Sequence, residues 1–380
     1  MSWTNIINQT RVKDLLTASV KRKRVAHAYL FSGPTGSGKS ATAIELAKVI
    51  NCTKSETEAC DVCSSCLRFN SLQHADVKLI FPLPVGKGEK AGDAPLAKLS
   101  DDDIATFHEQ INHKAQNSYH QISIPKANTI KVNSIREIRR ESSLSAFGKG
   151  KKVFIIIDAE TMNDESSNAI LKTLEEPHED TLLILTTSNP DALLPTIISR
   201  CQHIRFDTLS EDVITTALIE RKGITTERAK TIARLVNGNY SQALEYIDTS
   251  LEEHQQYAIE FLRAMIFKPR KVLLTEIEKI TSSYEKSDIK DIFNLISQWL
   301  HDAMILQQGI SSNLTAGSEE SLRKFIAVYP DCDYASANES LERAVSLVDK
   351  NVYIPLIILD LSARMKKHIR GNSMVQSSVG

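Results

Sequence analysis

The stretch HAYLFSGPTGSGKS (residues 27–40) joins an apolar strand to a glycine-rich loop. The loop, Gly33 to Ser40, fits the pattern GxxxxGK[ST], and residues 41–50 continue as an apolar helix. Such a strand, loop and helix can hold a phosphate, because the glycines let backbone N–H groups surround it at the positive end of the helix. The stretch predicts an α/β nucleotide-binding domain, and the alternative is a glycine-rich turn without a ligand.

We expect ATP with Mg²⁺ as the ligand of this loop. Lys39 would reach the β- and γ-phosphates, and the Ser40 hydroxyl would bind the metal. The predicted nucleotide-binding residues of the loop are Gly33, Pro34, Thr35, Gly36, Ser37, Gly38, Lys39 and Ser40.

Further apolar stretches at 153–157 and 181–189, each near a helical pattern, predict a parallel sheet buried on both faces. Asp158 ends the first of these strands, where a carboxylate can hold the metal of a bound nucleotide. In ATPases of this class a glutamate that activates water usually follows this aspartate, but here the next residue is Ala159. The departure weakens the case for hydrolysis.

The strand signal stops near residue 207, and helical patterns follow. We predict an α/β domain over 1–207, a small helical domain over 208–249, a larger all-α domain over 250–370 and a flexible tail over 371–380. Residues 85–128 interrupt the first domain with GKGEKAGDAP and the run Asp101 to Asp103. These polar and turn-forming residues predict an irregular insertion.

Four of the six cysteines are closely spaced, in the pattern C-x7-C-x2-C-x2-C. Two CxxC steps that share one cysteine bring three thiolates together, and a fourth can complete a tetrahedral set that suits a structural Zn²⁺. Reduced surface thiols, a redox pair and an iron–sulfur cluster are the alternatives. The predicted metal ligands are Cys52, Cys60, Cys63 and Cys66.

Composition bounds the class of protein. The chain of 380 residues has a formal net charge of −1 and 42% hydrophobic residues. This balance argues against disorder throughout and against coating of nucleic acid by charge alone. No apolar run approaches the ~20 residues of a membrane span, and residues 1–16 lack a signal-peptide core, so we expect a cytoplasmic protein. The basic stretches 21–24 and 131–152 could contact DNA phosphates or simply be solvated.

Several segments together resemble the clamp-loader subunits of bacterial DNA polymerase III, which are AAA+ proteins. They are the loop, the cysteine cluster, NAILKTLEEP (168–177), TTSNPDALLPTIISRC (186–201) and DKNVYIPLIILDL (349–361). The resemblance implies a P-loop AAA+ domain with a zinc knuckle at 52–66, a lid domain and a collar that holds a hetero-oligomeric ring. The implied partners are gamma/tau and delta subunits, the sliding clamp and, through the complex, primed DNA, with no membrane.

Two subunit types carry these segments, and three features favour the delta prime type over the gamma/tau motor. The motor pattern puts an Asp-Glu pair at positions 157 and 158, where this chain has Ile157 and Asp158. Ser241 stands where the motor has a sensor arginine. No Pro-rich extension follows the predicted collar, as one would in a tau-like chain.

The resemblance also implies roles for two further positions. Arg200, in Ser-Arg-Cys, resembles an arginine finger that points at the ATP of a neighbouring subunit. The alternative is a pair with a local carboxylate. Thr187 or its neighbour Thr186 would lie near the γ-phosphate, although a strand-capping threonine would look the same.

We therefore expect a delta prime-like subunit that helps to load the sliding clamp, can hold ATP, hydrolyses it poorly and supplies Arg200 to its neighbour. The first alternative is a gamma-type motor ATPase of the same complex. The second is a zinc-containing nucleic-acid-binding module with a vestigial nucleotide site.

Overall fold

The computed structural model describes residues 2–144, 148, 150–247, 251–284, 286–309, 319–349 and 352–370. The chain forms two compact units, Met1–Leu244 and Glu245–Gly380. The predicted tail 371–380 lies outside the described residues, and so do Ser145 to Phe147 and Lys149 in one basic stretch. The three-domain division remains a prediction. Among the described helices, none has the length and apolar character that a bilayer span requires.

The first unit is built on a parallel sheet, as the sequence predicts, and the strand order is β2-β3-β4-β1-β5. The strands are β1 (Ala28–Ser32), β2 (Val77–Ile80), β3 (Lys152–Ile156), β4 (Thr181–Thr187) and β5 (Gln202–Arg205). Every residue of β1, β3 and β4 is buried, which explains their unbroken apolar runs.

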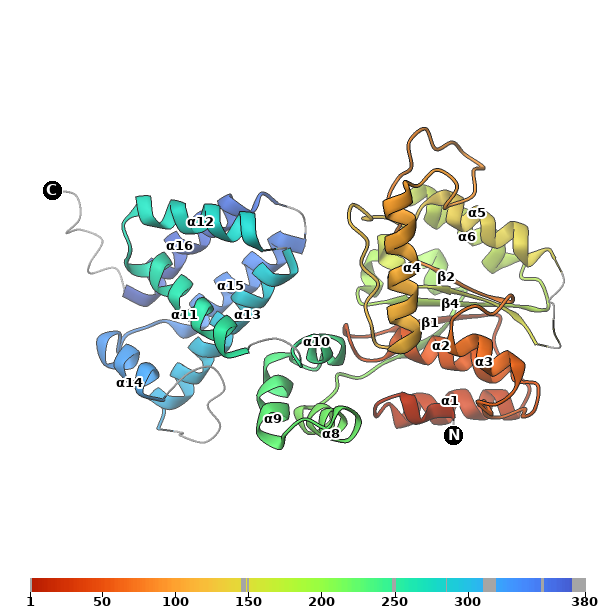
Figure 1. The fold of residues 1–380 in the computed structure, drawn as a ribbon, viewed down its shortest axis with the longest axis horizontal. Helices are drawn as coiled ribbons and strands as arrows, with labels where there is room; N and C mark the ends of the chain where they lie inside the picture. The colour runs from red at the N-terminus through yellow and green to blue at the C-terminus, as the bar shows by residue number, and fades with distance from the viewer. Residues whose placement is uncertain are drawn as a thin grey trace. The chain divides into compact units, whose positions relative to one another are not determined.

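Helices cover both faces of this sheet, and three further helices, α8 to α10, lie beside it (Figure 1). The helices up to this point of the chain are α1 (Thr10–Lys21), α2 (Lys39–Ile50), α3 (Ser64–Asn70), α4 (Asp101–Gln116), α5 (Val132–Ser142), α6 (Asp164–Glu175), α7 (Pro195–Ile198), α8 (Glu211–Lys222), α9 (Thr226–Leu235) and α10 (Tyr240–Glu245), with short 3-10 turns at Ser2–Asn5, Ala159–Thr161 and Pro190–Ala192.

Successive residues of a strand point to opposite faces of the sheet and pack into two separate hydrophobic cores. Tyr29 and Phe31 pack with α1, α2 and α3 on one face, whereas Leu30 packs with α5, α6 and α7 on the other. Because the strands are parallel, their carboxyl ends meet at one edge, where the loop before α2 also lies.

The prediction of an irregular insertion was wrong for residues 101–116, which form the sixteen-residue helix α4. Ser100 caps this helix by accepting a hydrogen bond from the Asp103 N–H at 3.2 Å. The run Asp101 to Asp103 lies in the first turn, where negative charge is favourable because of the helix dipole. The acidic run that suggested a loop is therefore a helix start.

In the described part of the second unit every regular element is a helix, as predicted. Its helices are α11 (Leu251–Phe267), α12 (Arg270–Ser283), α13 (Lys286–Gln307), α14 (Glu319–Val328), α15 (Tyr334–Asp349) and α16 (Ile354–Arg370). The apolar side chains of Phe293, Trp299, Leu341 and Ile358 are buried in its interior.

Candidate functional site

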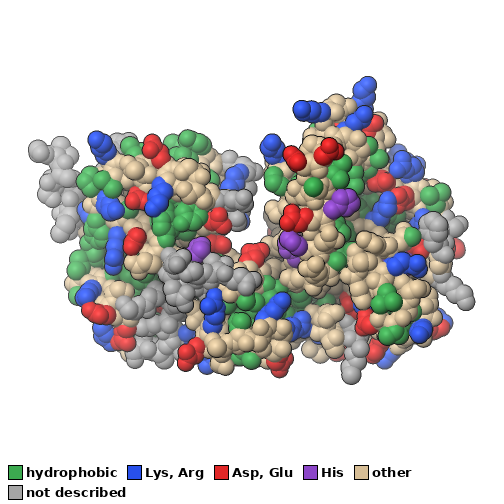
Figure 2. Space-filling model, in the orientation of Figure 1, with side chains coloured by type: hydrophobic (Ala, Val, Ile, Leu, Met, Phe, Trp, Pro, Cys, Tyr) green, Lys and Arg blue, Asp and Glu red, His purple; other side chains and the backbone are tan. Residues whose placement is uncertain are grey.

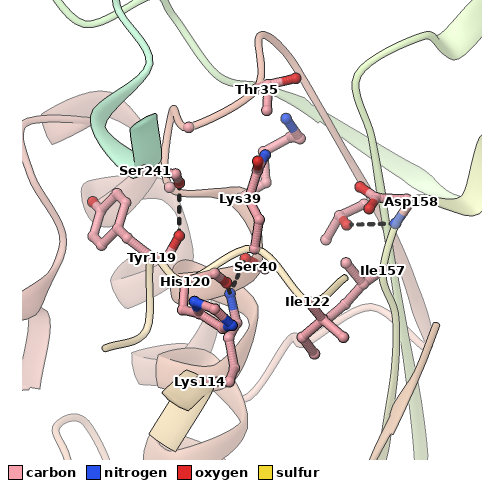
Figure 3. Close-up of a pocket in the computed structure, with 14 residues that line it drawn as sticks. Thr35, Lys39, Ser40, Lys114, Tyr119, His120, Ile122, Ile157, Asp158 and Ser241 are labelled. Atoms are coloured by element: carbon pink, nitrogen blue, oxygen red, sulfur yellow. Dashed lines mark hydrogen bonds between the residues drawn. The ribbon is translucent and has the colours of Figure 1, made fainter. Parts of the chain in front are cut away.

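A polar pocket opens in the first unit where the glycine loop meets the ends of β3 and β4 (Figure 3). Five of the predicted loop residues line it: Thr35, Gly36, Gly38, Lys39 and Ser40. Gly33, Pro34 and Ser37 belong to the same loop but do not line the pocket. Gly36 and Gly38 have positive φ angles of 73° and 96°, conformations that favour glycine.

The Lys39 side chain is turned back onto its own loop. Its Nζ donates to the carbonyl oxygens of Gly33 and Pro34, both at 2.7 Å. Burial lowers the pKa of Lys39 to about 8, and the carboxylates of Asp158 and Glu160 oppose this shift. The amino group predicted to reach phosphates is thus already hydrogen-bonded within the loop.

Asp158 lies in the pocket just beyond β3, as predicted, with a left-handed φ of 54°. Its N–H donates to the Thr186 hydroxyl at 3.3 Å. Burial, reinforced by Glu160, raises the pKa of the Asp158 carboxyl. Glu160 itself accepts hydrogen bonds from the N–H and hydroxyl of Ser188, at 2.9 and 2.6 Å.

The structure distinguishes the two threonines at the end of β4. Thr186 lines the pocket, and Thr187 does not. The Thr187 hydroxyl accepts from the Asn189 N–H at 3.1 Å, so it caps the turn after the strand. The proposed role of Thr187 beside a phosphate remains untested.

Sequence reasoning missed the insertion residues that enter this pocket. Lys114, in the last turn of α4, donates from Nζ to the Ser40 hydroxyl at 2.9 Å and to the His120 carbonyl at 2.7 Å. Burial lowers the pKa of Lys114 to about 7, against the opposing effect of Asp158. The other insertion residues that line the pocket are Tyr119, His120, Gln121 and Ile122. No local motif marks these residues as parts of a site.

Ser241 joins the insertion to α10. Its hydroxyl donates to the Tyr119 carbonyl at 2.6 Å, and the Tyr119 hydroxyl accepts from the Ile7 N–H at 2.8 Å. Ser241, which stands where the motor type has a sensor arginine, therefore forms a hydrogen bond with the insertion (Figure 3).

The four predicted metal-ligand cysteines come together. The Sγ atoms of Cys52, Cys60, Cys63 and Cys66 all lie within 4.8 Å of one another, a spacing that can hold a metal ion. Cys63 caps α3, and its Sγ accepts from the Cys66 N–H at 3.4 Å. Burial raises the pKa of Cys63, but hydrogen bonds from Thr53 and Cys66 outweigh it and bring the pKa to about 5, whereas burial and the hydrogen bond with Cys63 raise the pKa of Cys66 to about 12.

Arg200 does not line the pocket of its own chain. It forms an ion pair with Glu175 at 2.8 Å, and its Nη1 donates to the Thr196 carbonyl at 2.9 Å. Both side chains of the pair are partly exposed, at 35% and 48%. The local carboxylate that the alternative interpretation required is therefore present.

The two basic stretches both have exposed basic side chains. In 131–152, Lys131 and Lys152 are buried, the first paired with Glu89 at 2.7 Å and the second bonded to the Glu141 carbonyl. Arg136, Arg139 and Arg140 of that stretch are exposed, and so are residues 21–24. On the face shown in Figure 2, Lys and Arg side chains are interspersed with Asp and Glu. Lys131 and Lys152 are therefore poorly placed for phosphate contact, whereas both stretches keep exposed basic side chains.

Comparisons with known proteins find similar sequences. The family model described as "DNA polymerase III, delta subunit" matches residues 8–210. The delta prime subunit of DNA polymerase III from Bacillus subtilis (strain 168) is 31% identical over 274 residues, which cover 72% of this chain and 68% of that protein.

Relatives of the motor type also match. The tau subunit of the same organism is 25% identical over 319 residues, covering 81% of this chain but only 46% of that longer protein. A solved structure of a gamma subunit-related DNA polymerase III protein from Thermotoga maritima covers 95% of this chain and is itself covered to 99%, at 16% identity and a TM-score of 0.39.

Proposed function

Because this chain belongs to the clamp-loader subunit family of bacterial DNA polymerase III, within the AAA+ class, we propose that it is a delta prime-type subunit. It works in a ring with gamma/tau and delta subunits and helps to load the sliding clamp on primed DNA. Its own ATPase activity is weak or absent. The observation that carries this proposal is the pocket itself, where Lys39 is bonded to its own loop and Ser241 to the insertion.

Reconstitution tests the proposal. The chain is mixed with candidate gamma/tau and delta subunits, the sliding clamp and primed DNA, and loading is followed by fluorescence of a labelled clamp. We expect loading to require this chain and to survive Lys39→Ala. Loading that proceeds equally well without the chain contradicts the proposal.

Arg200 supplies a guanidinium to ATP held by the neighbouring subunit. Its pair with Glu175 is partly exposed, and such pairs contribute only ~0–1 kcal/mol, so redirecting Arg200 costs little. Arg200→Ala is expected to leave the chain folded and lower the ATPase rate of the complete complex at least tenfold at that site. Arg205→Ala, a nearby exposed arginine, is the matched control. Equal rates for both variants would remove the finger role.

The gamma-type motor remains the alternative, favoured by the complete GxxxxGKS loop and the similarity to tau. It predicts robust DNA-stimulated ATP hydrolysis by the purified chain alone, abolished by Lys39→Ala. A rate indistinguishable from that of the Lys39→Ala variant favours the delta prime type.

The cysteine cluster binds one structural Zn²⁺ per chain. Four thiolates suit this ion and leave no open coordination position for catalysis. Residues 52–66 contain little apolar core apart from Ala59, Cys63 and Cys66, so the metal supplies most of the folding energy of this segment.

A further inference from the structure

The pocket of the glycine loop does not fit a magnesium nucleotide in the arrangement described. Segment 114–122 leaves a cavity of about 50 Å³, whereas pockets for small ligands typically measure roughly 300–1,000 Å³. The groups that a nucleotide would need are also engaged. They are the Lys39 amino group, bonded to its loop, and the Ser40 hydroxyl, bonded to Lys114.

The hydrogen bond at Ser40 is the contact least compatible with a bound magnesium ion. Mg²⁺ demands near-octahedral oxygen ligands at about 2.0–2.1 Å. The Ser40 oxygen instead accepts a hydrogen bond from Lys114 at 2.9 Å, and the same amino group is bonded to the His120 carbonyl. Lys114 is only 3% exposed, so its amino group has no route to solvent without movement of the segment. A magnesium ion and this amino group would compete for one hydroxyl.

Tyr119 fills the site beside the loop and is held from three directions. Its hydroxyl accepts from the Ile7 N–H, its carbonyl accepts from Ser241, and its ring meets Tyr240 edge-on with centroids 5.0 Å apart. The hydroxyl also lies directly against the glycine loop, because a Cβ added at Gly38 would be 2.8 Å from it.

The base of the insertion is fixed as well. Glu89, near the start of the insertion, pairs with buried Lys131 at 2.7 Å and accepts from the Gly86 N–H at 3.0 Å. On α4, Phe107 stacks on Phe81 with ring centroids 5.6 Å apart. The insertion is thus packed on the domain near its start and along α4, which leads into the pocket.

We propose that segment Lys114–Ile122 is an intramolecular plug of the nucleotide site, with the Lys114 amino group at the hydroxyl that would otherwise bind magnesium. Nucleotide enters only when this segment withdraws. The inference rests on the proposed function in treating the loop as a nucleotide site. It would account for a subunit that retains a complete loop motif but has weak or absent ATPase activity.

The test is a titration of the purified full chain with a fluorescent ATP analogue and Mg²⁺. Lys114→Met keeps the length of the side chain but cannot hydrogen-bond to Ser40, and it is expected to tighten binding at least tenfold. Ser241→Ala, a milder change that releases the Tyr119 carbonyl, is expected to tighten binding by a smaller factor. Lys98→Met, an exposed lysine of the same insertion, is the control and should leave binding unchanged.

Hydrogen exchange gives a second readout. Amides of residues 117–122 should exchange faster in Lys114→Met and in the wild-type chain at saturating nucleotide. Wild-type binding in the micromolar range that neither variant tightens overturns the plug, and so does an absence of binding in all variants. Reconstituted clamp loading is measured separately, so the plug can fail while the proposed function stands, and the reverse also holds.

Discussion

The cysteine knuckle and the glycine loop are both candidate ligand sites that short motifs mark in the sequence, but only the knuckle has all its candidate ligands within one short segment. All four candidate ligands of the knuckle lie between residues 52 and 66, and the fold brings them within 4.8 Å. The glycine loop instead meets Lys114, 74 residues away from Ser40 along the chain. A motif therefore specifies a site fully only when no distant segment enters it.

The largest expected effect is loss of metal from the knuckle. Cys63→Ser should abolish the one zinc per chain and unfold residues 52–66, since structural zinc sites contribute on the order of 10 kcal/mol. Metal analysis and hydrogen exchange measure both effects. Cys201→Ser, outside the cluster, should retain full zinc. Retention of zinc by the Cys63 variant would show that the ion is not held by these four cysteines.

The second largest effect is expected on stability, from a substitution at the contact between the glycine loop and the insertion. Gly38→Ala places a Cβ at φ 96° and 2.8 Å from the Tyr119 hydroxyl, and should destabilise the first unit by about 2–3 kcal/mol in denaturant unfolding. Gly88→Ala is the control, because it has a similar positive φ of 68° but nothing within 4 Å. It should cost only about 1 kcal/mol. Equal costs would mean that Tyr119 does not lie against the loop in solution.

The pH dependence of stability reports on Lys114. Its pKa is about 7 in the folded chain, whereas that of an unperturbed lysine is 10.5, so between these values the unfolded chain binds more protons and stability rises with pH. Lys114→Met removes this contribution. The stability of the variant relative to wild type should be greatest near pH 7 and should decrease by about 2 kcal/mol by pH 9. A difference that stays constant with pH would contradict the burial of this amine.

The smallest effect is expected at the Arg200 pair. Glu175→Gln removes the charge of the partner while preserving its shape, and should change the free energy of unfolding by less than about 1 kcal/mol. Denaturant unfolding of the two chains measures it. A loss well above ~2 kcal/mol would identify Arg200 as a structural residue of its own chain.

The sequence predicted the sheet because apolar runs such as Val153 to Ile157 are long and unbroken, which only burial on both faces explains. It predicted the loop and the cysteine cluster because each is contiguous. It missed α4 because the same aspartates favour loops and helix starts. The cap at Ser100 decides between the two, and only the folded chain shows the cap.

The part of the site that comes from the insertion was beyond local reasoning. A lysine near the end of a polar helix ordinarily interacts with solvent and the helix dipole. No sequence pattern near Lys114 indicates a contact with Ser40. Ser241 drew attention for the arginine it replaces, whereas its role in the structure is to bind the Tyr119 carbonyl.

The length of α4 has a consequence for control of the site. A helix of sixteen residues extends about 24 Å, so the cap at Ser100 is far from Lys114 at the other end. Segment Lys114–Ile122 belongs to the same chain as the loop that it contacts. Its effective concentration at the loop therefore depends on the connecting chain and not on the amount of protein, and for short flexible connections it is in the millimolar range. A change at Ser100 that weakens the helix would lower this local concentration without touching the loop.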